Sequence, residues 1–168
     1  PLGIEKIGNI LAEHGVERFS GNPPQFSSSE RKFILPDSGH ESHFRKAQEA
    51  LGMRFEWKPN HDGKLPDSMF SVCGQWFIVE HKHMKEPGGG QDKQVVEIAD
   101  FIRNDESSRG VHYVSFLDGI MFNQIFTDTA SGKMLTQKTS IERMLSQCKS
   151  NYFVNTFGFI KLIQALTD

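Results

Sequence analysis

The chain has 168 residues, of which 37% are hydrophobic and 24% are charged, and its formal net charge is −2. This composition is typical of a globular protein and excludes a disordered chain, and no apolar run approaches the roughly 20 residues of a membrane-spanning helix. A sequence pI near 6.4 argues only weakly against nucleic-acid binding, because local basic residues can still line a groove.

The first part of the chain is expected to form two amphipathic helices separated by a loop. Residues 4–16 place apolar side chains at helical spacing, whereas residues 19–29 are rich in Gly, Pro and Ser and predict an irregular loop. A second helix is predicted to begin at Asp37 or Ser38, either of which can cap it, and to end at about Leu51.

Three segments with strand character follow the second helix. They are residues 53–58, 68–73 and 76–84, and the tight turn Gly74-Gln75 joins the last two. Because the connections are short, these segments predict an antiparallel meander of three strands.

The second half of the chain alternates helices and strands. The loop 85–90 (KEPGGG) leads into residues 91–104, which have apolar residues at i, i+3, i+4 and i+7 and form the clearest predicted helix. Residues 111–117 suit a buried strand, and residues 118–137 show no clear pattern and are interpreted as a hairpin excursion. The remaining predicted elements are a helix over 140–148, a strand over 152–155 and a helix over 157–166. This order predicts an α/β fold with a mixed central sheet flanked by helices, and we expect residues 1–168 to form one domain.

The strand 76–84 carries charged residues where apolar ones are expected. Since side chains alternate along a strand, Glu80 and Lys82 share a face with Trp76 and Ile78, and such charges are costly to bury without a partner or a function. The hairpin also folds Asp67 back beside Glu80. Two carboxylates suit a hard cation such as Mg²⁺, and a neighbouring lysine can orient a water molecule or neutralise a phosphate.

These residues form a recognisable motif. Pro66-Asp67, twelve residues and then Glu80-His81-Lys82 is similar to the PD-(D/E)XK motif of the restriction-endonuclease-like nuclease superfamily. The predicted order of elements over about residues 38–117 also resembles the common core of that family. The resemblance implies hydrolysis of DNA phosphodiester bonds with Mg²⁺, for which Mn²⁺ is expected to substitute. Asp67 and Glu80 would ligate the metal and Lys82 would assist catalysis.

The resemblance implies further site residues on the neighbouring helices. Several members add a glutamate from the preceding helix, where Glu41 is favoured because it shares a face with Phe44, and Glu49 is the alternative. Others place a glutamine on the helix after the lysine strand, and Gln91 and Gln94 are the candidates, with Gln91 preferred as a catalytic residue. The residues expected to contact DNA are Lys85, Lys93 and Gln94.

The resemblance favours a type II restriction endonuclease or its cleavage module, acting on double-stranded DNA. Cutting both strands requires two active sites, so a homodimer or a transient dimer is expected, and a separate domain could recognise the DNA sequence. Pro1 to Gly3 are interpreted as a tag remnant, and the chain as either complete or a fragment. Two cysteines without paired spacing indicate a reducing compartment, and the cytoplasm of a bacterium or an archaeon is expected.

Other interpretations stay open at this stage. The nuclease alternatives are a structure-specific or repair enzyme of the same fold and a non-catalytic DNA-binding module. His81 and His83 with Cys73 suggest a zinc site, although they lack the paired ligand spacing of structural zinc. The sequence LPDS occurs twice, and in the first copy Asp37 is interpreted as a helix cap.

Overall fold

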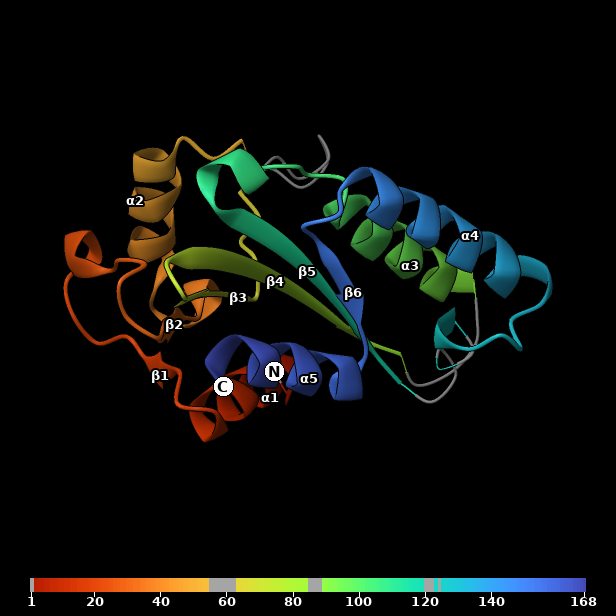
Figure 1. The fold of residues 1–168 in the computed structure, drawn as a ribbon, viewed down its shortest axis with the longest axis horizontal. Coiled ribbons are helices and arrows are strands. Elements are labelled where there is room, and N and C mark those ends of the chain that lie inside the picture. The colour runs from red at the N-terminus through yellow and green to blue at the C-terminus, as the bar shows by residue number, and fades with distance from the viewer. Residues whose placement is uncertain (1, 55–62, 85–88, 120–122, 124) are drawn as a thin grey trace.

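A six-stranded mixed sheet organises the chain (Figure 1). The computed structural model describes residues 2–54, 63–84, 89–119, 123 and 125–168. The strands are β1 (Glu17–Arg18), β2 (Lys32–Ile34), β3 (Ser68–Val72), β4 (Gln75–His83), β5 (Val111–Asp118) and β6 (Tyr152–Val154), and they lie in this order across the sheet. The strand β3 is antiparallel to both of its neighbours, β2 and β4, whereas β5 runs parallel to β4 and β6 parallel to β5. The predicted α/β class with a mixed sheet is confirmed.

Helices cover both faces of the sheet. They are α1 (Leu2–Glu13), α2 (Glu41–Leu51), α3 (Gly89–Phe101), α4 (Gly132–Gln147) and α5 (Thr156–Thr167). The helices α1 and α5 lie on one face, and α2, α3 and α4 lie on the other (Figure 1). In the described part of the chain, no helix combines the length and the apolar character needed to cross a membrane.

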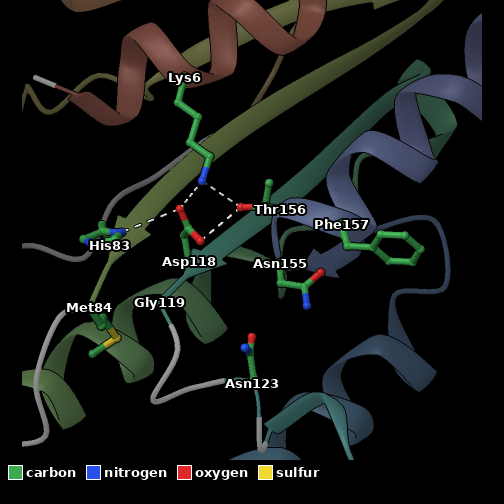
Figure 2. Close-up of a pocket in the computed structure, with 9 residues that line it drawn as sticks. All are labelled: Lys6, His83, Met84, Asp118, Gly119, Asn123, Asn155, Thr156 and Phe157. Atoms are coloured by element: carbon green, nitrogen blue, oxygen red, sulfur yellow. Dashed lines mark hydrogen bonds and ion pairs between the residues drawn. The ribbon is translucent and has the colours of Figure 1, made fainter.

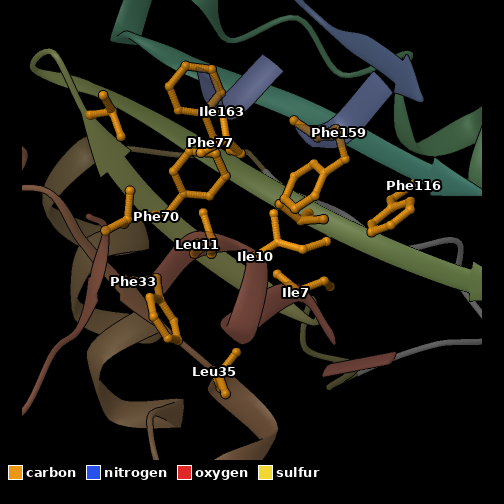
Figure 3. Packing of buried hydrophobic residues seen from close by; sticks show 14 residues of the cluster. Ile7, Ile10, Leu11, Phe33, Leu35, Phe70, Phe77, Phe116, Phe159 and Ile163 are labelled. Atoms are coloured by element: carbon orange, nitrogen blue, oxygen red, sulfur yellow. The ribbon is translucent and has the colours of Figure 1, made fainter. Parts of the chain in front are cut away.

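The alternation predicted for β4 is confirmed by its packing. Phe77 and Val79 belong to the core formed with α1 and α5, which Figure 3 shows from close by. Trp76 and Ile78 belong to the opposite core, which contains Phe44 of α2. The same alternation directs the side chains of residues 80 and 82 toward the α3 face and those of residues 81 and 83 toward the α1 face.

The first strand of the meander differs from the prediction. That strand is β2, whose Ile34 pairs with Met69 of β3, and not the segment 53–58. Met53 and the residue after it are not in a strand, because the N–H of Met53 instead donates to the carbonyl of Gln48 at the end of α2, and residues 55–58 lie outside the described residues. The helix that directly precedes the meander is therefore α1, and α2 is inserted between β2 and β3.

Two helices begin at other residues than predicted. Pro36–Ser38 form a short 3₁₀ turn that ends at Gly39, whose φ of 93° cannot continue a helix, so α2 begins at Glu41 and Asp37 does not cap it. The helix α4 begins at Gly132, well before the predicted start at Ser140. The predicted helices at the two ends of the chain, the helix α3 and the strands β5 and β6 are confirmed within a few residues.

Candidate active site

Asp67 lies directly before β3 and is held by the backbone of β4. Its N–H donates to the carbonyl of Val79 at 3.1 Å, and its Oδ2 accepts the N–H of His81 at 2.7 Å. Ser68 pairs with Val79, and continuing this antiparallel register places Asp67 opposite Glu80. The hairpin therefore brings the two carboxylates to one face of the sheet, as the sequence predicts.

Glu80 is a buried carboxylate with one satisfied and one unsatisfied oxygen. The residue is only 1% exposed. Its Oε1 lies 2.8 Å from Nζ of Lys64, which donates a hydrogen bond, and 3.4 Å from Nζ of Lys82. Its Oε2 is buried and has no hydrogen-bond partner among the described residues. A buried polar atom without a partner is costly, so this oxygen marks a position where a ligand is to be expected.

The surroundings of Glu80 disfavour its charged form. Burial, together with the neighbouring carboxylate of Asp67, raises the pKa of Glu80 to about 7, although the ammonium groups of Lys64 and Lys82 act in the opposite direction. Burial also raises the pKa of Asp67, against the hydrogen bond from the His81 N–H and the charges of the two lysines. Additional positive charge at this position would therefore stabilise both carboxylates in their ionised form.

Lys82 lies between two carboxylates from different elements. Its Nζ is 3.4 Å from Glu80 Oε1 on β4 and 3.9 Å from Glu97 Oε2 on α3. Asp67, Glu80, Lys64 and Lys82 are hereafter called the Glu80 cluster, and Glu97 borders it. The predicted grouping of Asp67, Glu80 and Lys82 is thus seen in the structure.

Three charged residues near this site were not predicted from the sequence. Lys64 belongs to the loop before β3, where no motif distinguishes it. Glu97 lies between Val95 and Ile98, which are both buried, and a carboxylate beside two core residues of α3 could have indicated a site residue. Asp37 follows β2, the strand beside β3, and its charge raises the pKa of Asp67. The repeated LPDS sequence could have pointed to Asp37 as a counterpart of Asp67. The interpretation of Asp37 as a helix cap was wrong.

Of the other predicted site residues, Glu41 and its alternative Glu49 do not join the cluster. The side chain of Glu41 is 65% exposed and its Oε1 lies 3.8 Å from Nε of Arg45, so the predicted inward orientation is wrong. Glu49 is also exposed. Lys93 and Gln94 are exposed on α3. The predicted Lys85 lies outside the described residues, and of Gln91 only the helical backbone is described.

The structure bears on the kind of metal that the site could hold. Among the described residues, no three His, Cys, Asp or Glu side chains are arranged as a metal-binding group. The suggested zinc site has no support, since Cys73 lies in the turn before β4 while His81 and His83 lie at the other end of that strand. The two carboxylates of the Glu80 cluster fit Mg²⁺ instead, which is commonly held by one or two carboxylates together with water and substrate phosphate.

Comparisons with protein-family models, with curated proteins and with solved structures found no match for this chain. The interpretation of the Glu80 cluster therefore depends on its own geometry and chemistry. Site chemistry carries a functional argument better than the fold does, because one fold serves many functions.

Proposed function

We propose that this chain is a metal-dependent DNA endonuclease whose active site is the Glu80 cluster. The observation that carries the proposal is the buried Oε2 of Glu80, which has no hydrogen-bond partner among the described residues and lies beside a second carboxylate. A divalent cation held there would satisfy this oxygen and offset the repulsion between Asp67 and Glu80. Lys64 and Lys82 do not satisfy Oε2, because both of them lie beside the other oxygen, Oε1.

Each residue of the cluster has a role in this proposal. Asp67 and Glu80 would hold Mg²⁺, or Mn²⁺ in its place, and the bound ion would stabilise negative charge on the scissile phosphate and lower the pKa of a water molecule. The hydrogen bond from the His81 N–H fixes the orientation of Asp67. Lys82, placed at the border of the cluster, would orient the attacking water or neutralise the phosphate.

Lys64 supplies a positive charge to Glu80 when no metal is bound. Its ammonium donates to Oε1 of Glu80 at 2.8 Å and is only partly exposed. An ammonium at this position competes with a divalent cation for the same carboxylate. When a cation takes over Glu80, Lys64 is released toward solvent and can contact the DNA backbone, since lysine binds phosphate as a point charge.

The order of elements supports the same proposal. In the proposed nuclease, the elements that resemble the PD-(D/E)XK core would be the helix α1, the antiparallel meander β2-β3-β4, the helix α3 and the strand β5, which runs parallel to β4. The helix α2 would be an insertion between β2 and β3. Asp67 precedes the second of these antiparallel strands, and Glu80 and Lys82 lie on the third. We propose a type II restriction endonuclease or its cleavage module, acting as a dimer on DNA.

Incubation of supercoiled plasmid with the purified protein tests this function. We expect nicked and linear DNA when Mg²⁺ is present and intact plasmid when EDTA replaces it. Mapping the ends separates a restriction enzyme, which cuts at one sequence, from a repair nuclease, which cuts at junctions or lesions. Intact plasmid, together with unchanged junction and flap substrates in Mg²⁺ and in Mn²⁺, would contradict the nuclease proposal.

A further inference from the structure

A cavity of about 580 Å³ is lined by the residues that Figure 2 shows. One of them, His83, points to the face of the sheet opposite to that of Lys82 in the Glu80 cluster. The cavity is found where the parallel strands β4, β5 and β6 end and where α5 begins, and its lining includes His83, Asp118 and Asn155. Crevices at the carboxyl ends of parallel strands are common ligand sites in α/β proteins. The volume is within the roughly 300–1,000 Å³ typical of small-molecule pockets.

One wall of this cavity carries opposite charges that pair with each other. Lys6 of α1 forms an ion pair with Asp118 and donates a hydrogen bond to Oγ1 of Thr156 at 2.8 Å. Thr156 in turn donates to Oδ1 of Asp118 at 3.0 Å, and Nδ1 of His83 lies 3.6 Å from Oδ2 of the same carboxylate (Figure 2). Because this charge is internally balanced, the wall suits an uncharged polar group better than a free ion.

The rest of the cavity offers amide groups and an aromatic ring. Figure 2 shows the carboxamides of Asn123 and Asn155 pointing toward one another. Oδ1 of Asn155 accepts the N–H of Gly158 at 2.8 Å, which leaves the NH₂ group of Asn155 as the donor on the cavity side. Phe157, the next residue but one, is 68% exposed, and Nζ of Lys161 lies 5.4 Å from the centre of its ring.

These groups match the chemistry of a nucleobase. Carboxamides form paired hydrogen bonds with base edges, an exposed aromatic ring offers a stacking surface, and a lysine beside the ring suits the adjoining phosphate. We propose that this cavity binds one unstacked nucleotide of the DNA strand that the Glu80 cluster cleaves. The proposal rests on the proposed nuclease function, and it extends that function by naming a substrate with an unpaired or turned-out nucleotide near the scissile bond.

The position of the cavity relative to the Glu80 cluster supports this assignment. Lys82 and His83 are consecutive on β4 and point to opposite faces, so the two sites lie back to back at the same end of the sheet. A sheet and its packed side chains are about 10 Å thick, a distance that a few nucleotides can span. One strand that crosses the end of β4 can therefore present a phosphate to Lys82 and a base to Asn155.

Binding measurements on matched variants test the proposal. The probe is a fluorescein-labelled DNA duplex that carries one unpaired nucleotide, compared by anisotropy with the fully paired duplex, in Ca²⁺ without Mg²⁺. The test variant is Asn123→Ala with Asn155→Ser, since serine retains an oxygen to cap α5, and a second variant is Phe157→Ala. The controls are Asn9→Ala on the exposed side of α1 and Leu135→Ala, an exposed apolar residue of α4.

We expect the wild type to prefer the duplex with the unpaired nucleotide, each test variant to lose roughly tenfold or more of its affinity for that duplex, and both controls to keep it. Unchanged affinity in both test variants, or a wild type that binds the fully paired duplex at least as tightly, overturns the cavity proposal. Plasmid and flap cleavage in Mg²⁺ by the same preparations keeps the two claims apart. Cleavage without cavity-dependent binding overturns the cavity alone, whereas cavity-dependent binding without cleavage supports the nucleotide site and overturns the nuclease.

Discussion

Replacing Glu80 by glutamine is expected to stabilise the metal-free protein at alkaline pH and to change little at acidic pH. Burial and the charge of Asp67 raise the pKa of Glu80 from 4.5 to about 7. Between pH 4.5 and about pH 7, Glu80 keeps its proton in the folded protein but has released it in the unfolded chain. The stability contributed by this proton is fully present below pH 4.5 and is lost as the pH rises through about 7.

The size of the effect follows from the two pKa values. Each pKa unit corresponds to 1.36 kcal/mol, so the change from 4.5 to about 7 corresponds to about 3 kcal/mol of unfolding free energy. Glutamine has the shape of glutamate and carries no charge at any pH. The advantage of Glu80→Gln over the wild type should therefore grow from near zero at acidic pH to about 3 kcal/mol at about pH 8.

Urea unfolding in EDTA, followed by circular dichroism at a series of pH values, measures this difference. Glu49→Gln is the matched control, because Glu49 is exposed on α2, and its difference from the wild type should not follow this pH profile. Added Ca²⁺ should then stabilise the wild type at about pH 8 by about 2.7 kcal/mol at one hundred times its dissociation constant, and Glu80→Gln by much less. A pH-independent difference, or equal stabilisation of both proteins by Ca²⁺, would refute the reasoning.

Three further substitutions are expected to separate the roles of the charged residues. Lys82→Ala should lower the cleavage rate by about 10²- to 10⁴-fold and keep Mg²⁺ binding, and loss of binding in calorimetry would contradict its assignment to water or phosphate. Lys64→Met should bind Mg²⁺ at least as tightly as the wild type, because it removes the competing ammonium at Glu80, and yet cleave more slowly. Weaker Mg²⁺ binding by Lys64→Met would instead mean that the lysine helps to build the metal site. Glu41→Gln should leave the Mg²⁺ dependence of the rate unchanged, since Glu41 is exposed and paired with Arg45, and a shifted dependence would restore it to the site.

The elements that the sequence predicts well are those with their own periodic pattern. Alternation along β4 and the helical spacing of Val95 and Ile98 depend on residues within one segment, so they can be recognised locally. The strand β2 has only three residues, and its strand character depends on pairing with β3, which lies more than thirty residues away. The insertion of α2 between β2 and β3 could not be seen for the same reason.

The candidate site was predictable to the extent that a hairpin defines it. Asp67, Glu80 and Lys82 come together because a tight turn sets the register of β3 and β4. Lys64 and Asp37 reach the site from loops, whose course no periodic pattern specifies. Glu41 was assigned wrongly because sharing a side of α2 with Phe44 does not determine which residues of the first turn face the sheet.

The most direct test of the central claim is plasmid cleavage by Asp67→Asn beside the wild type, each prepared identically and shown to be folded by circular dichroism. This substitution keeps the size of the side chain and an oxygen that can accept the His81 N–H, so the hairpin should stay intact. The proposed metal site then loses one of its two carboxylate charges. We expect Mg²⁺-dependent cleavage by the wild type and none by the variant. Cleavage by Asp67→Asn at the wild-type rate would contradict the assignment of the active site to the Glu80 cluster.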